Sequence, residues 1–377
     1  MEGPVYVPHR TVFPTKEIKE LHLDSQLLDM PEDDESKARN LCREEYDSYA
    51  GYKSVQEIIL NEARDDIRFL HETTDALERI KEYAVVSPLL DEEHLSIKDE
   101  TVQPTKSFKI RGAANFILKH LVNSGEDTVI TASAGNHGQG VALVTHKLGL
   151  KSIIVVPEGT PQTKLDGIEQ YGGHVIKHGS TYQEASRYAQ ELQNGRGAVY
   201  VPAYNHRDIM AGQATIALEL LEKKPDTTDI VVPAGGLGLL AGVARYTHAA
   251  RPDVKVWGSA VEDKSSALAS FAARTVVHSE VDPLADGIAV NEVGDETFAV
   301  SYRTAAGILP VSHDRLRQTV ARLAQAEHLA EPAGAIAVAA VLSHFRAGRR
   351  PVAVLTGANI DNSTLAYCLE SLQPREA

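Results

Sequence analysis

Residues 127–156 read DTVITASAGNHGQGVALVTHKLGLKSIIVV and combine two kinds of pattern. The β-branched runs Val129–Ala132 and Ser152–Val156 are typical of buried strands, and Gly140–Leu148 has the spacing of a helix. A strand, a helix and a second strand in this order are typical of a βαβ unit, in which the strands are parallel. The segment therefore predicts an α/β fold.

The same alternation continues towards the C-terminus. The further predicted strands are His174–Lys177, Ala198–Val201, Ile230–Pro233, Val254–Val261 and Pro351–Leu355. The further predicted helices are Thr163–Tyr171, Tyr182–Gln193, Ile209–Lys223, Gly238–Ala250, Asp314–His328 and Gly334–Ala347. Ligands of such parallel sheets bind beyond the carboxyl ends of the strands, so the loops that follow strands are the candidate sites.

The N-terminal part of the chain differs in charge. Residues 1–100 hold 25 acidic and 12 basic residues, whereas residues 101–377 hold 27 and 26. A helical pattern runs from Val55 to Tyr83. We therefore expect an acidic extension, residues 1–74, to precede the catalytic core, and its role as a lid, an oligomer contact or a solvating arm stays open.

Composition excludes several classes of protein. The formal net charge is -14, and no Lys/Arg run is longer than Arg349–Arg350, which argues against nucleic acid or an anionic membrane as a partner. Cys42 and Cys368 lie outside any metal-ligand spacing. With no signal peptide or membrane-spanning run expected, the chain is predicted to be cytoplasmic, with a small molecule as its partner.

Two glycine-rich turns follow predicted strands. Residues 133–140 (SAGNHGQG) and 233–242 (PAGGLGLLAG) each open a helix, where free N–H groups attract an anion. In the second, residues 236–241 fit the dinucleotide pattern G-x-G-x-x-A, and Glu262 follows at the end of the next strand. The same N–H groups would hold a phosphate monoester equally well, so this loop alone leaves both ligands open.

Two further segments present reactive groups. Residues 105–112 (TKSFKIRG) place Lys109 between apolar neighbours, where desolvation lowers the pKa of an amine and prepares it for Schiff-base chemistry. The alternative is a lysine that only extends from a helix start to water. Residues 355–361 (LTGANID) form a strand-end turn that presents the Thr356 hydroxyl.

In this order the four segments resemble the pyridoxal-phosphate enzymes of fold type II, the tryptophan synthase β superfamily, and above all its threonine and serine dehydratases. The likeness runs from Ser87-Pro88-Leu89 to Asp361 and includes residues 285–290 (ADGIAV) and 331–335 (EPAGA). It favours pyridoxal phosphate over a nicotinamide cofactor. It implies two Rossmann-like lobes with twisted, mostly parallel sheets: a large cofactor-binding domain, residues 75–122 and 209–377, and a small domain, residues 123–208.

The resemblance also implies roles for individual residues. Lys109 would hold the cofactor covalently and act as the catalytic base, and Asn136 would bond its phenolic oxygen. Thr356 would meet the pyridine nitrogen, with Phe108 and Glu331 beside the cofactor. The cofactor phosphate would be held by Gly235, Gly236, Leu237, Gly238 and Leu239. The substrate carboxylate would be held by Ser133, Ala134, Gly135, Asn136 and His137.

These roles predict an ammonia-lyase that eliminates the β-hydroxyl of threonine or serine to give a 2-oxo acid and ammonia. The neutral hydroxyl of Thr356 makes the ring a weaker electron sink than a carboxylate would, which favours expulsion of a leaving group. The alternatives are elimination or replacement on an acidic or phosphorylated amino acid, and racemisation. We expect a homodimer, and, because the chain ends shortly after Asp361, none of the regulatory domain that biosynthetic threonine dehydratases append.

Four positions depart from the family pattern. Racemases have serine where this chain has Ala134, which disfavours racemisation. Leu237 replaces a glycine, and because its Cβ disfavours positive φ we expect a reshaped phosphate cradle. Lys106 also replaces a glycine, and we expect it to contact an acidic substrate group or to be a solvated loop lysine. No metal site is expected, since Leu268 stands six residues after Glu262, where the metal-binding relatives have aspartate.

Overall fold

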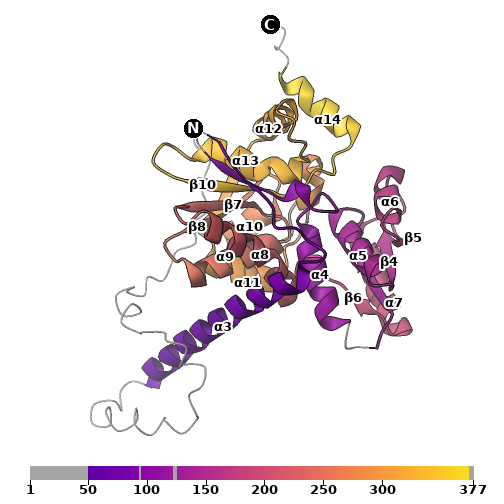
Figure 1. Cartoon of the computed structure of the whole chain (residues 1–377), viewed down its shortest axis with the longest axis horizontal. Coiled ribbons are helices and arrows are strands. Elements are labelled where there is room, and N and C mark those ends of the chain that lie inside the picture. Colours follow the sequence, from indigo (N-terminus) through magenta and orange to yellow (C-terminus); the bar gives the residue numbers. More distant parts are fainter. Residues whose placement is uncertain (1–49, 93–94, 122–124, 373–377) are drawn as a thin grey trace. The chain divides into compact units, whose positions relative to one another are not determined.

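The computed structural model describes residues 50–92, 95–121 and 125–372 (Figure 1). The chain divides into two compact units, and their boundary, between Arg68 and Phe69, falls inside helix α3 (Ala50–Ile80). Residues 69–372 contain every strand of the described chain. Most of the predicted acidic extension lies outside the described residues, and its described part, residues 50–74, belongs to α3.

The larger sheet has six strands in the order β1-β2-β10-β7-β8-β9, and all neighbours are parallel except β1 and β2. Its strands are β1 (Leu89–Asp91), β2 (Ser96–Asp99), β7 (Asp229–Pro233), β8 (Lys255–Val261), β9 (Gly307–Val311) and β10 (Pro351–Leu355). Both faces are buried, as is typical of parallel sheets. Ile230 and Val232 of β7 face one core, and Val231 between them faces the other.

Helices cover both faces of this sheet (Figure 1). Helices α8 (Arg207–Lys223) and α9 (Gly238–Ala250) pack in the first core, and α12 (His313–Gln325) and α13 (Pro332–His344) pack in the second. The remaining helices of the larger lobe are α10 (Ser266–Ala273), α11 (Asp295–Thr304) and α14 (Asn362–Leu369). Short 3-10 turns occupy η3 (Glu100–Val102), η4 (Pro283–Ile288) and η5 (Glu370–Leu372).

The smaller sheet has four parallel strands in the order β5-β4-β3-β6. They are β3 (Thr128–Ala132), β4 (Lys151–Val156), β5 (His174–Lys177) and β6 (Val199–Tyr200). One face packs against α4 (Lys109–His120), α5 (Asn136–Lys147) and α6 (Gln162–Glu169), and the other against α7 (Tyr182–Arg196). Helix α4 thus shares the core of the smaller sheet, while the limits of the two domains at residues 122 and 208 stay a prediction.

The predicted fold class, an α/β protein with mostly parallel sheets, is confirmed. All seven predicted strands are present, and their ends agree to about one residue. The predicted helices are present too, although α5 begins at Asn136 rather than at Gly140. Among the described residues, no helix combines the length and the apolar character that crossing a bilayer requires.

Sequence reasoning missed strands that break the usual composition of a buried strand. Strand β9 contains Pro310, which lacks a backbone donor and is tolerated because β9 lies at the edge of the sheet. Strand β2 reads SIKD, and its Lys98 is fully buried against Glu219. From the sequence alone, the lysine in SIKD suggests a loop, because the ion pair with Glu219 that allows its burial is formed with a residue distant in the chain.

Candidate active site

Loops from both sheets surround a cavity of about 1400 Å³. They lie at the carboxyl ends of β3, β6, β7 and β10, which is where parallel sheets bind ligands. All of the predicted cofactor and substrate residues except Lys106 line this cavity. They are Phe108, Lys109, Ser133, Ala134, Gly135, Asn136, His137, Gly235, Gly236, Leu237, Gly238, Leu239, Glu331 and Thr356.

Lys109 is the first residue of α4, and the backbone around it is tied to the end of β10. The Phe108 N–H donates to the Thr356 carbonyl oxygen at 3.1 Å. The Lys109 ammonium donates to the Ala203 carbonyl oxygen at 3.1 Å. Burial lowers the pKa of Lys109 to about 8, and the opposing charge of Glu331 only partly offsets this. A substantial fraction of the amine is therefore neutral near pH 8 and able to accept a proton.

Asn136 is held between two side chains. Its Nδ2 donates to Glu331 Oε1 at 2.6 Å, and its Oδ1 accepts from Asn359 Nδ2 at 2.6 Å. Burial raises the pKa of Glu331 to about 8, and nearby Asp286 adds to the effect. These contacts orient the carboxamide of Asn136 at the start of α5.

The loop Gly235–Leu239 precedes and opens α9. Its five backbone N–H groups have no protein acceptor in the part of the chain that the structure describes. A Cβ at Gly236 would lie 2.5 Å from the Tyr204 ring. Any residue other than glycine would therefore force the loop or the tyrosine to move. Unpaired N–H groups at the start of a 13-residue helix attract an anion, so the loop fits the phosphate of the expected cofactor.

The Cβ of Leu237 does not prevent a positive φ, while the expected reshaping of the phosphate cradle stays a prediction. Leu237 keeps the left-handed backbone that suits glycine, with φ 69°. Its side chain is buried in the core of the larger sheet, at 1% exposure. The burial of the leucine side chain therefore compensates the cost of a left-handed L-residue, about 1–2 kcal/mol.

Replacing Leu237 by glycine and by alanine separates these two effects. Both variants lose a buried side chain, which costs about 2–5 kcal/mol, but only alanine keeps the left-handed strain. We expect both to be less stable than the native protein and the alanine variant to be the less stable of the two. Unfolding of the holoenzyme in denaturant measures this order. An alanine variant more stable than the glycine variant would contradict it.

Thr356 and His137 are both buried and are held by hydrogen bonds to backbone groups. Thr356 follows β10 and is buried at 4% exposure, with its N–H donating to the Gly334 carbonyl at 3.3 Å. His137 Nε2 lies 3.2 Å from the Val201 carbonyl oxygen, and burial together with the charge of Lys109 lowers its pKa to about 3. The imidazole is therefore neutral and already bonded, which leaves the backbone of residues 133–137 as the part able to hold a substrate carboxylate.

The structure does not bring Lys106 into the cavity. Its side chain is exposed, and its backbone has φ 54°. The Lys106 N–H donates to the Gln103 carbonyl oxygen at 2.7 Å, which closes a turn, and the Lys106 carbonyl oxygen accepts from the Ala358 N–H at 3.0 Å. The substrate contact expected for Lys106 is therefore corrected: the position needs a turn conformation in which glycine is usual, and the side chain points to solvent.

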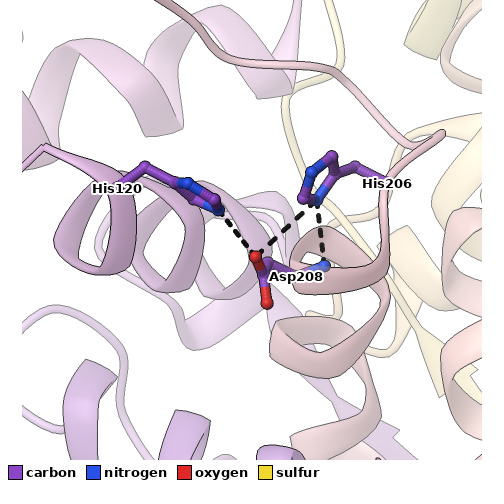
Figure 2. Close-up of side chains that lie close together, drawn as sticks. All are labelled: His120, His206 and Asp208. Carbon is purple, nitrogen blue, oxygen red and sulfur yellow. Dashed lines mark hydrogen bonds and ion pairs between the residues drawn. The ribbon is translucent and has the colours of Figure 1, made fainter.

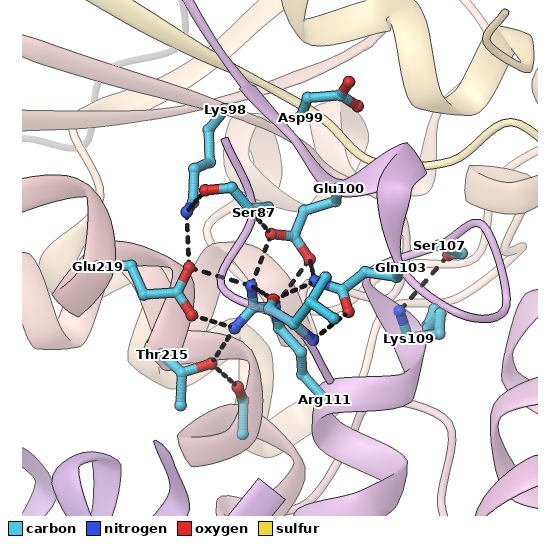
Figure 3. Close-up of polar contacts among 12 residues, drawn as sticks. Ser87, Lys98, Asp99, Glu100, Gln103, Ser107, Lys109, Arg111, Thr215 and Glu219 are labelled. Atoms are coloured by element: carbon cyan, nitrogen blue, oxygen red, sulfur yellow. Dashed lines mark hydrogen bonds and ion pairs between the residues drawn. The ribbon is translucent and has the colours of Figure 1, made fainter. Parts of the chain in front are cut away.

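A buried charge cluster supports the start of α4 (Figure 3). Arg111 donates from Nε and Nη2 to the two oxygens of Glu100, at 2.7 and 2.8 Å, and from Nη1 to Glu219 Oε1 at 2.6 Å. Lys98 donates to Glu219 Oε2 at 2.6 Å. Burial alone would raise the pKa of Glu100, but Arg111 reverses this and lowers it. The charges of Arg111 and Lys98 thus balance those of Glu100 and Glu219 in a buried site. Arg111 stands two residues after Lys109.

Several cavity residues were not singled out from the sequence. Ala203, Tyr204 and Asn205 follow β6, and Asn359 lies in the same turn as Thr356. The rule that ligands bind after parallel strands would have found all four. Polar residues of helix α7 also line the cavity, and no sequence motif marks them as site residues. They are Tyr182, Gln183, Ser186, Gln190 and Gln193.

Comparison with known proteins gives consistent matches. A biosynthetic L-threonine dehydratase of Pasteurella multocida is 38% identical over 308 residues, which cover 78% of this chain and 60% of the relative. An L-threonine ammonia-lyase of Thermotoga maritima is 39% identical over 268 residues, 70% of this chain and 67% of the relative. The chain thus spans about 60% of the length of the biosynthetic dehydratase.

Solved structures agree with these matches. The processed form of threonine deaminase isoform 2 from Solanum lycopersicum superimposes with a TM-score of 0.78 and 32% identity, covering 82% of this chain and 88% of that one. The family model described as pyridoxal-phosphate dependent enzyme matches residues 79–357, which include Lys109, the glycine loop and Thr356. On this match, and on the cavity that these residues line together, the chain belongs to the family of pyridoxal-phosphate dependent enzymes.

Proposed function

We propose that this protein is an ammonia-lyase that converts L-threonine, and more slowly L-serine, to a 2-oxo acid and ammonia. The observation that carries the proposal is the cavity in which Lys109, the loop Gly235–Leu239 and Thr356 come together. The relatives of Pasteurella multocida and Thermotoga maritima, named for threonine dehydration and ammonia release, support the choice of substrate.

Each element of the cavity has a task in this reaction. The N–H groups of residues 235–239 would hold the cofactor phosphate, and Asn136, oriented by Glu331 and Asn359, would donate to an oxygen of the cofactor ring. Bound pyridoxal phosphate supplies a ring that withdraws electrons from the α-carbon of the amino acid. Lys109, with its lowered pKa, accepts the α-proton.

Two features favour elimination over racemisation. Thr356 offers a neutral hydroxyl where a carboxylate would favour accumulation of negative charge on the ring. Ala134 lines the cavity without a group able to deliver a proton. Departure of the β-hydroxyl as water, followed by hydrolytic loss of ammonia, yields 2-oxobutanoate from threonine.

Release of 2-oxo acid from a panel of amino acids tests the proposal. The purified protein should be yellow, and borohydride should fix the cofactor to the peptide that contains Lys109. We expect turnover of L-threonine and L-serine, with no formation of the D-enantiomers. A colourless protein that added cofactor leaves unchanged, or one that racemises without releasing 2-oxo acid, would exclude this function.

The same assay tests the position of Lys106. Because its side chain points to solvent, the Lys106→Ala variant should keep the native ratio of turnover among threonine, 3-hydroxyaspartate and O-phosphoserine, within about twofold. Threonine should be preferred in both proteins. If the variant instead turned over 3-hydroxyaspartate and O-phosphoserine much more slowly but threonine at the native rate, Lys106 would contact the substrate.

We further propose a homodimer located in the cytoplasm. Val85, Val86 and Val102 are exposed at 45%, 57% and 46%, and Gln103, the residue after Val102, bonds the backbone of Val85. An apolar patch of this kind supports self-association. Cys368 is a buried free thiol, which agrees with a reducing compartment. Light scattering of the purified holoenzyme gives the oligomeric state.

A further inference from the structure

Two histidines and one aspartate meet beside the cavity, at the contact between α4 and α8 (Figure 2). His120 is the last residue of α4, while His206 and Asp208 lie at the start of α8. One ligand atom from each lies within 4.8 Å of the other two. His206 also lines the cavity, so the cluster adjoins the active site without containing any of the groups assigned to the reaction.

The donor atoms have nearly the spacing of a tetrahedral metal site. His120 Nε2 lies 2.6 Å from Asp208 Oδ2, and His206 Nδ1 lies 3.9 Å from the same oxygen. Two ligands of a tetrahedral zinc ion are about 3.3 Å apart, since each bond is about 2.0–2.2 Å long. The two distances to Asp208 Oδ2 therefore lie on either side of this spacing, each within about 0.7 Å of it.

Neighbouring groups hold the three side chains in place. The Phe116 ring stacks on His120 at 4.3 Å and meets His206 edge-on at 4.9 Å, so one aromatic side chain orients both imidazoles. Lys119 bonds Asp208 Oδ1 at 2.6 Å and leaves Oδ2 to face the histidines. Such outer contacts are what orient metal ligands in known sites.

One ring nitrogen of His206 carries no proton. Its Nδ1 accepts from the Asp208 N–H at 3.0 Å, so this nitrogen has a lone pair, which is directed at that backbone N–H. Binding would exchange the contact between His206 Nδ1 and the Asp208 N–H for a metal–nitrogen bond.

We propose that His120, His206 and Asp208 form a site for a divalent cation of the zinc type, with one or more positions left for water. Two imidazoles and one carboxylate suit zinc or cobalt, whereas magnesium and calcium prefer oxygen ligands. The ion would tie α4, which begins with Lys109, to the segment 203–208, whose Ala203 carbonyl accepts from Lys109. The site is thus a structural brace for the active-site loop after β6.

Cobalt absorption of the holoenzyme tests the site directly. One equivalent of Co²⁺ per chain should produce visible d–d bands, and Zn²⁺ should displace them and raise Tm. The His120→Ala and His206→Ala variants should each bind Co²⁺ at least about 100-fold more weakly. His146→Ala, which removes an exposed histidine of α5 outside the cavity, should bind like the native protein.

The cofactor itself binds metals, so the comparison among variants decides the outcome. Equal Co²⁺ binding by all three variants, or no stoichiometric binding by the native protein, would overturn the proposal. Each variant is first required to retain the native amount of bound cofactor. If His120→Ala fails this, His120→Gln replaces it, because an amide side chain keeps polarity but is a poor ligand for zinc.

Discussion

Replacing Lys109 with alanine is expected to lower the release of 2-oxo acid from threonine by about 10⁴-fold. The variant loses the only lysine that lines the cavity next to the glycine loop and the Thr356 turn, and with it the amine whose pKa burial has lowered. Lys164 also reaches the cavity but pairs with Asp286 at its edge. No other lysine of the described chain lines the cavity.

The control is the neighbouring lysine. Lys106→Ala removes the same side chain three positions earlier, where the structure places it in solvent, and should keep nearly native turnover. Borohydride should fix the cofactor covalently in the control but not in Lys109→Ala. Partial recovery of Lys109→Ala by added methylamine would assign the loss to the missing amine. Retention of more than a tenth of native turnover would exclude Lys109 as the catalytic base.

Replacing Arg111 with alanine is expected to cost about 3–5 kcal/mol of stability, since it leaves charged groups buried without their partner. Arg111 is fully buried, and both Glu100 and Glu219 rely on its guanidinium. Lys98 remains to neutralise one carboxylate, so Glu100 is the group left uncompensated. We expect a fall in the Tm of the holoenzyme of roughly 5 °C.

Two further variants make this result specific. Arg350→Ala breaks an ion pair with Asp226 on the surface, where both side chains are more than half exposed, and should cost less than about 1 kcal/mol. Arg111→Lys keeps the charge but loses the two-pronged contact with Glu100, and should lie between the two. If Arg111→Ala is as stable as Arg350→Ala, the cluster does not support the fold in this way.

Sequence patterns predicted the strands that lead into the cavity because a buried parallel strand is a local signal, a short run of β-branched residues. They also predicted the loops of the cavity, since the carboxyl ends of parallel strands share one edge of a sheet. They failed for β2, where Lys98 looks like a loop residue until its contact with Glu219 is known. They did not foresee the positive φ of Leu237, and they left Lys106 open between a substrate contact and the solvated position that it has in the structure.

Apart from the desolvation expected for Lys109, the side-chain environments of the cavity could not be read from the chain. The pKa of Glu331 is raised by burial, and its bond to Asn136 joins residues 195 positions apart. The residues of the contact between His120 and Asp208 are 88 positions apart, so no sequence motif predicts this contact. Each of these contacts depends on which helices pack together. Helix packing depends on the ridges and grooves that many side chains form on a helix surface, and not on single residues.

The chain's local patterns were sufficient for the α/β fold, because backbone periodicity, glycine placement and turn chemistry act over a few residues. The cofactor and the role proposed for Lys109 came from the resemblance of four segments to a known family. Burial, electrostatic partners and the direction of each side chain required the folded molecule, because they arise where α4, α8 and the two sheets come together. The charge cluster around Arg111, the solvent-facing Lys106 and the histidine site belong to this second class, since desolvation and Coulomb interactions depend on distance in space and not along the chain.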